Sequence, residues 1–204
     1  SRDTTFADSV FLGFAINPTG AALVGVTRVR AVAGVARFED FRLQRAGTGY
    51  QLLVGRPGLI ADTSTAIAIT ARPASSLDLA SGGGQTAAPG SPLPSPIIVR
   101  VTDPYANPVA GVIVSFATTN GTLGAAADTT DATGAASTTW TLGAVVGTQS
   151  MTVTASGLAG SPLTVNASGS AGIATTTLAP QLDTLTAIGA SRLLVPTSRD
   201  GANN

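Results

Sequence analysis

The chain has 204 residues, and its 11 acidic and 11 basic side chains give it no net charge. Without a basic surplus, the sequence does not favour a nucleic-acid partner. It contains neither Cys nor His, which excludes thiol catalysis, disulfides and metal sites built from those two residues. We expect no cofactor, and no membrane span because no stretch is long and apolar enough. Thr, Val, Gly and Pro are frequent, a composition typical of an all-β protein.

Short strands separated by turns are predicted in the first third of the chain. Val10, Leu12 and Phe14 share one face at strand period. Further strands are expected at residues 24–32, at residues 34–43 with a bend near Glu39 and Asp40, and around Ile67 and Ile69.

Tyr50 has a more specific setting, in the stretch AGTGYQL, two residues before Leu52. In immunoglobulin sandwiches a Tyr two residues before a core position bonds back to the corner backbone. The same residue could also be an ordinary strand Tyr. We favour the tyrosine corner.

Residues 97–116, IIVRVTDPYANPVAGVIVSF, show the clearest pattern in the sequence. Apolar residues alternate in both arms, while Asp, Pro, Asn and Gly between them favour a turn. This predicts a hairpin of two half-buried strands that need a second sheet to cover their apolar face. The preceding SGGGQTAAPGSPLPS has the composition of a flexible linker. We expect instead a sheet edge, where Pro is tolerated. Later strands are expected at residues 135–142, 147–158 and 161–169.

Short motifs recur in the sequence at a spacing of about 100 residues, which is the size of one immunoglobulin-like (Ig-like) sandwich. Gly34-Val35-Ala36 recurs as Gly134-Ala135-Ala136, and Gly47-Thr48 recurs as Gly147-Thr148. Near the C-terminus, VPTSRDGAN resembles VRVTDPYAN of the opening strand and turn. We therefore expect tandem sandwiches, one complete in residues 74–171 and one split. Residues 1–73 would lack the first strands of a sandwich, and residues 172–204 would be the first strands of another.

Three stretches resemble the group 1 bacterial Ig-like repeat of intimin and invasin type adhesins. They are PIIVRVTDPYANPVAGVIVSF, TDATGAASTTWTL and GTQSMTVTASGL. The resemblance covers about residues 75–170, and residues 1–73 and the C-terminal stretch are similar to related repeats. It implies a rod of extracellular β-sandwiches at a bacterial surface. Such repeats have no catalytic residues.

The chemistry-bearing residues have structural explanations. Asp103, Asp128, Asp131 and Asp200 all lie in turn sequences. Without His or Cys, no usual nucleophile–base pair is available, so no enzyme is expected. A calcium site could use Asp78 and Asp183 near unit starts, but no cluster supplies the six or more oxygens that Ca²⁺ requires.

Two aromatic residues keep a second interpretation open. Trp140 shares a face with Thr138 and Leu142, which favours a core position. If it were exposed, it could stack on a sugar, as could Tyr105.

We therefore expect a structural repeat of an extracellular rod or filament. Copies would join head to tail, with strands of one copy completing the N-terminal unit of the next, or would be parts of one longer tandem array. The alternative is an adhesive or carbohydrate-binding module that contacts a host or matrix surface. The strand donors would be Leu182, Leu185, Ile188, Leu193 and Val195, and the acceptors Val10, Leu12, Phe14, Phe38 and Leu52.

Overall fold

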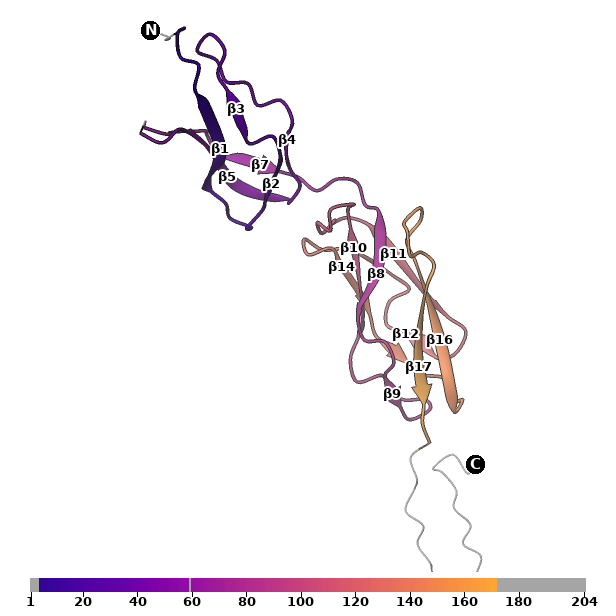
Figure 1. The fold of residues 1–204 in the computed structure, drawn as a ribbon. Coiled ribbons are helices and arrows are strands. Elements are labelled where there is room, and N and C mark those ends of the chain that lie inside the picture. Colours follow the sequence, from indigo (N-terminus) through magenta and orange to yellow (C-terminus); the bar gives the residue numbers. More distant parts are fainter. Residues whose placement is uncertain (1–3, 59, 172–204) are drawn as a thin grey trace, which may run out of the picture.

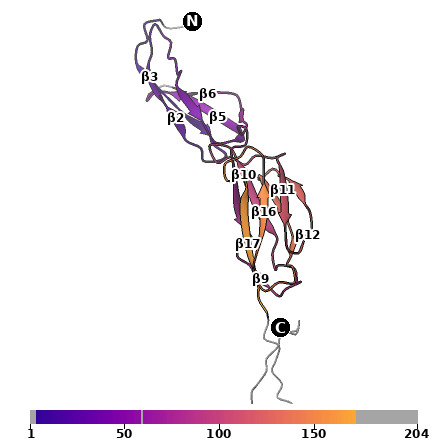
Figure 2. The same cartoon turned by 90° about the vertical axis from the view of Figure 1, so that its right-hand side faces the viewer.

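The computed structural model describes residues 4–58 and 60–171, which form two β-rich units arranged end to end (Figure 1, Figure 2). The all-β prediction is confirmed for this part of the chain. No helix long and apolar enough to cross a membrane occurs among these residues. The N-terminal unit contains β1 (Ser9–Ile16), β2 (Leu23–Gly25), β3 (Arg28–Arg30), β4 (Phe41–Leu43), β5 (Gly47–Gly55), β6 (Asp62–Thr63) and β7 (Ile67–Ile69).

The C-terminal unit follows β7 after a short connection and is a two-sheet sandwich (Figure 1). One sheet has the order β14-β10-β8, the other β13-β11-β16-β17-β9, and β12 pairs with β15. Its strands are β8 (Ser76–Ser81), β9 (Thr86–Ala87), β10 (Ile97–Thr102), β11 (Ile113–Thr118), β12 (Thr122–Leu123), β13 (Ala127–Thr129), β14 (Ala135–Thr138), β15 (Trp140–Thr141), β16 (Gly147–Thr154) and β17 (Leu163–Gly169).

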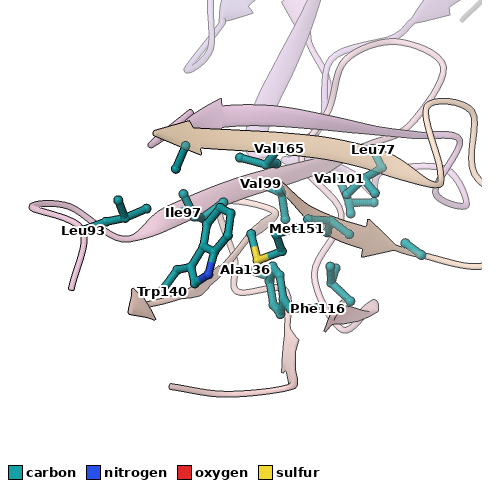
Figure 3. Packing of buried hydrophobic residues seen from close by; sticks show 14 of the residues in the cluster. Leu77, Leu93, Ile97, Val99, Val101, Phe116, Ala136, Trp140, Met151 and Val165 are labelled. Carbon is teal, nitrogen blue, oxygen red and sulfur yellow. The ribbon is translucent and has the colours of Figure 1, made fainter. Parts of the chain in front are cut away.

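The core of the C-terminal unit lies between these two sheets. Figure 3 shows side chains of β10 directed across the gap toward the opposite sheet and toward Trp140. Trp140 is only 1% exposed, and its indole N–H donates to the carbonyl of Asn120 over 3.2 Å. The core prediction for Trp140 is therefore confirmed. The side chains that fill this core include Ile97, Val99, Val101, Val114, Phe116, Met151, Val153 and Val165.

The predicted hairpin of residues 97–116 is wrong. β10 pairs with β8 and β14, whereas β11 pairs with β13 and β16. The turn between them therefore carries the chain from one sheet to the other. Alternation of apolar residues reports which face of a strand is buried, not which strand lies beside it. Both buried faces point into the same core from opposite sides.

Residues 24–32 also differ from the prediction, because they form two strands instead of one. β2 pairs with β4, while β3 pairs with β1 in the larger sheet. In the segment between β2 and β3, the carbonyl of Thr27 accepts a hydrogen bond from the amide of Leu12 in β1 over 2.8 Å. Of residues 34–43, only β4 is a strand, and the chain bends at Asp40 just before it, where the bend was expected.

The Gly- and Pro-rich stretch of residues 81–95 belongs to the sheet edge, as expected. β9 within it pairs in parallel with β17. The side-chain amide of Gln85 donates to the carbonyl of Ser95 over 2.9 Å and accepts from the Ser95 amide over 2.8 Å. The β8–β10 register shifts at Ile98, which marks the bulge.

The two units share one pattern of strand pairing over part of their length. In the N-terminal unit β1 pairs with β3 and β5, β2 with β4, and β5 with β7. In the C-terminal unit β11 pairs with β13 and β16, β12 with β15, and β16 with β17 in the same way. Gly34 and Gly134 both have positive φ, at 74° and 72°. Among the described residues, the N-terminal unit has no counterpart of the sheet β14-β10-β8.

The N-terminal unit accordingly has a thinner core. Phe14 and Leu52 face one another across β1 and β5 and are half-buried, whereas the corresponding Phe116 and Val153 are buried. Of the expected acceptor residues, Leu12 is buried, and Val10, Phe14, Phe38 and Leu52 are half-buried. Their acceptor role stays a prediction, as do the split of one sandwich and the domain boundaries. The expected donor residues lie outside the described part of the chain.

Neighbouring residues of β11 provide a direct test of this fold. Val114 is completely buried, whereas Ile113 is 68% exposed. We expect Val114→Asp to lower the free energy of unfolding of the C-terminal unit by about 3 kcal/mol or more, because it buries an unpartnered carboxylate. The control Ile113→Asp should change it by less than about 1 kcal/mol, since the side chain stays in water. Urea unfolding followed by Trp140 fluorescence measures both, and equal losses would show that the assigned faces are wrong.

Candidate functional site

Tyr50 shapes the backbone at the end of the N-terminal unit that faces its neighbour. The side chain is completely buried, and its hydroxyl donates to the carbonyl of Arg45 over 2.9 Å. This bond runs five residues back along the chain, so the predicted tyrosine corner is confirmed. Thr19 contributes a second hydroxyl contact to Tyr50. The corner thereby positions Gln44 and Ala46 on either side of Arg45.

A compact turn of residues 103–107, here called the junction turn, follows β10 in the C-terminal unit. Asp103 closes it, because one carboxylate oxygen accepts from the amides of Tyr105 over 2.8 Å and Asn107 over 2.9 Å. Ala106 lies between these amides with a φ of 60°, a value uncommon for residues other than Gly, Asn and Asp. Asp and Asn side chains that bond nearby amides are typical of such turns.

The junction turn also bonds to the N-terminal unit. The amide oxygen of Asn107 accepts from the Ala46 N–H over 2.8 Å, and its Nδ2 donates to the Gln44 carbonyl over 2.7 Å. Asn107 Nδ2 also donates to the second carboxylate oxygen of Asp103 over 2.9 Å. The same oxygen accepts from the backbone amide of Arg72, in the connection between the units, over 2.9 Å. One side-chain pair therefore joins both units and their connection.

Burial makes these bonds important. Asp103 is 3% and Asn107 4% exposed, although both lie in a turn. A buried polar group without a hydrogen-bond partner would destabilise the fold, and the polar atoms of both side chains have partners. Burial by itself raises the pKa of Asp103, but hydrogen bonds from the Asn107 side chain and from the amides of Arg72, Asn107 and Tyr105 together lower the pKa below its ordinary value. The carboxylate therefore stays ionised without a cationic partner.

Two grooves flank the contact between Asn107 and Gln44. The larger, of about 660 Å³, is lined by residues 19–22, Val24, 44–46 and 105–108. The smaller, of about 280 Å³, is lined by residues 42–44, Ile69, Thr70, Arg72, Asp103, Tyr105 and Asn107. The guanidinium carbon of Arg72 lies 5.3 Å from the centroid of the Tyr105 ring, a cation–π contact.

The sequence predicts that Asp103 lies in a turn but does not indicate its contacts with the connection and the other unit. Turn chemistry explains the bonds to Tyr105 and Asn107, whereas the bonds to the N-terminal unit depend on where that unit lies. The position of this turn beside a short connection was a usable signal. No group of three or more His, Cys, Asp or Glu that could hold a metal occurs in the described residues. Asp78 is exposed, and Asp183 lies outside the described part.

No family model matches the sequence, and no curated protein matches it. Solved structures do. Over most of its length the chain matches bacterial Ig-like domains of surface proteins. The D0–D1 domain of intimin is 20% identical with a TM-score of 0.36, over 79% of this chain and 78% of that one. Invasin, described as a bacterial integrin-binding protein, is 20% identical with a TM-score of 0.40, over 84% of this chain and 33% of that one.

The surface layer protein SbsC, domains 4–9, is 17% identical with a TM-score of 0.38, over 86% of this chain and 24% of that one. An intimin fragment solved in complex with the translocated intimin receptor also matches, as does a β-glycosidase from Bacteroides vulgatus. The chain spans a third or less of several of these proteins. Identities this low concern the fold alone.

Removing the side chain of Asn107 tests the junction. In Asn107→Ala we expect hydrogen exchange of the Ala46 amide to accelerate about fivefold to tenfold, the equivalent of about 1 to 1.4 kcal/mol for one lost hydrogen bond. Asn166→Ala is the control, because Asn166 is exposed on β17. Exchange measured by NMR that is the same in both variants and the parent would contradict the contact.

The lowered pKa of Asp103 predicts an acid-dependent stability. The folded-state pKa lies below the unfolded one, so the stabilisation is complete above about pH 4 and is lost as the pH falls through the folded-state pKa. We expect the parent to exceed Asp103→Asn in free energy of unfolding at pH 7, with a difference that shrinks below about pH 4. Urea titrations at stepped pH measure it. A difference that is constant from pH 7 to pH 2 would show that the Asp103 carboxylate is not the stabilising group. Asp131 also has a lowered pKa but is present in both proteins, so its effect cancels.

Proposed function

We propose that this chain is a structural repeat of an extracellular bacterial rod, in which Ig-like units are held end to end by side chains of the junction turn. The observation that supports this most directly is the pair Asp103 and Asn107, which is buried and bonded to both units and their connection. A joint built this way resists bending, because bending would separate buried polar groups from their partners. An extracellular location and absence of catalysis belong to the same proposal.

The N-terminal unit supports a second part of the proposal, that it is completed by strands from a neighbouring repeat. In the C-terminal unit, β10 contributes the fully buried Ile97, Val99 and Val101 to the core. The N-terminal unit has no such strand among the described residues, and its apolar side chains at Phe14 and Leu52 are half-buried. An incompletely covered sheet invites strand addition.

The strands would come from residues 174–204 of the neighbouring repeat. VPTSRDGAN in that stretch resembles VRVTDPYAN, which in the C-terminal unit covers the end of β10 and the junction turn. The expected donors Leu182, Leu185, Ile188, Leu193 and Val195 would supply the missing apolar side chains. The neighbouring repeat is either a separate copy, bound head to tail, or part of the same longer chain. A head-to-tail contact that does not close produces a fibre.

Light scattering and electron microscopy of the 204-residue chain test this completion. With separate copies, we expect oligomers that lengthen with concentration, that are abolished by Ile188→Asp and that are retained in Ser191→Asp, a matched charge beside the apolar positions. With a covalent array, we expect the single chain to be monomeric. In a fusion of two copies, the backbone amides of Phe14 and Leu52 in the second copy should then exchange hydrogen more slowly than the same amides in the single chain.

A monomeric single chain whose fusion shows no gain in protection would contradict completion by residues 174–204. Oligomers that persist in Ile188→Asp would place the contact elsewhere. Neither result bears on the junction turn, which the exchange of Ala46 tests separately.

A further inference from the structure

Three arginines line the grooves beside the junction turn, and none of them forms an ion pair in the described residues. Arg42 and Arg72 line the smaller groove and Arg45 the larger. Within the described residues, the guanidinium groups of Arg42 and Arg45 have neither a hydrogen bond nor an ion pair, and that of Arg72 contacts only the Tyr105 ring. Arginine side chains that line a groove without an ion pair favour the binding of an anion.

One acidic side chain lines these grooves, and although it is ionised, it forms no ion pair with the three arginines in the described residues. Asp103 belongs to the smaller groove, but each of its carboxylate oxygens already accepts two N–H groups. No other Asp or Glu lines either groove. The chain as a whole has no net charge, so this positive cluster is local and is not a consequence of a basic protein.

The remaining lining is suited to a polar ring. Tyr105 is 38% exposed and lines both grooves, as do Gln44 and Asn107. The Gln44 side-chain amide and the Thr70 hydroxyl have no hydrogen-bond partner in the described part of the chain, so donors and acceptors are both available. Tyr combines an apolar ring face with a polar end, which suits the faces of a sugar.

We propose that the junction grooves bind a carboxylated saccharide, of the kind found in acidic polysaccharides. Arg42 and Arg72 bind the carboxylate, since the planar guanidinium group matches the two oxygens of a carboxylate. The Tyr105 ring contacts the sugar face, and Gln44 and Thr70 bond its hydroxyls. The larger groove, next to Arg45, accommodates the adjoining residue of the polymer. This binding goes beyond the structural role and gives the rod a contact with an acidic matrix.

An acidic peptide fits these grooves less well than a saccharide. The side chains bordering both grooves, Gln44, Tyr105 and Asn107, are polar, whereas tight peptide grooves present apolar pockets for anchor side chains. A nucleic acid needs a charged stripe much longer than three arginines. The small size of the grooves, the mixed polarity of their lining and one exposed aromatic ring therefore favour a saccharide.

The test is an NMR titration of the 204-residue chain with trigalacturonic acid, compared with its methyl ester, which is the same sugar without the charge. We expect saturable shifts at the amides of Gln44, Thr70 and Tyr105 with the acid and none with the ester. Arg42→Gln should weaken binding about tenfold or more. Arg28→Gln, an exposed arginine on β3 away from the grooves, should leave affinity within about twofold.

Four results would overturn the proposal. These are no saturable shifts with the acid, equal binding of the ester, equal loss in Arg28→Gln and Arg42→Gln, or binding of tripolyphosphate or a tri-aspartate peptide as tight as that of the sugar acid. Arg42 has no side-chain bonds to lose among the described residues, so its variant should keep the parent melting temperature. If that temperature falls, the same comparison is made with Arg45→Gln, for which a loss smaller than threefold would also overturn the proposal.

Discussion

The arrangement of the two units depends on one side chain, the carboxamide of Asn107. Its oxygen and nitrogen bond the amide of Ala46 and the carbonyl of Gln44, as a strand neighbour would, and its nitrogen also bonds Asp103. A carboxamide has a donor and an acceptor at fixed separation, so it matches two backbone groups that flank one residue. Neither an acidic nor an aliphatic side chain could replace it.

The tyrosine corner and the junction turn belong to one hydrogen-bond network, which is connected through the backbone around Arg45. Tyr50 fixes the backbone at Arg45, and the residues on either side are those that Asn107 bonds. A feature that stabilises a single sandwich therefore also shapes the surface presented to the next one. Because these groups are buried, the loss of any one leaves partners unsatisfied, which is why the junction should respond to single substitutions.

The two units differ in how completely their sheets are covered. The C-terminal unit has a second sheet, with β10 at its centre, and a core that includes Trp140. The N-terminal unit repeats the pairings of β11 to β17 and has no counterpart of that sheet in the described residues. Stability of a β-sandwich comes mainly from apolar area buried between its sheets. The two units should accordingly differ in stability.

The sequence by itself determined the all-β class, the core position of Trp140, the corner at Tyr50, and the turn at Asp103, because each follows from local periodicity or local hydrogen bonding. The tertiary structure decided that β10 and β11 lie in opposite sheets and that residues 24–32 divide between two. It also gave Asn107 its partners in the other unit. These outcomes depend on contacts between residues distant in the sequence, such as the 61 residues that separate Asn107 from Ala46. Alternation marks a buried face without naming the strand or unit that covers it.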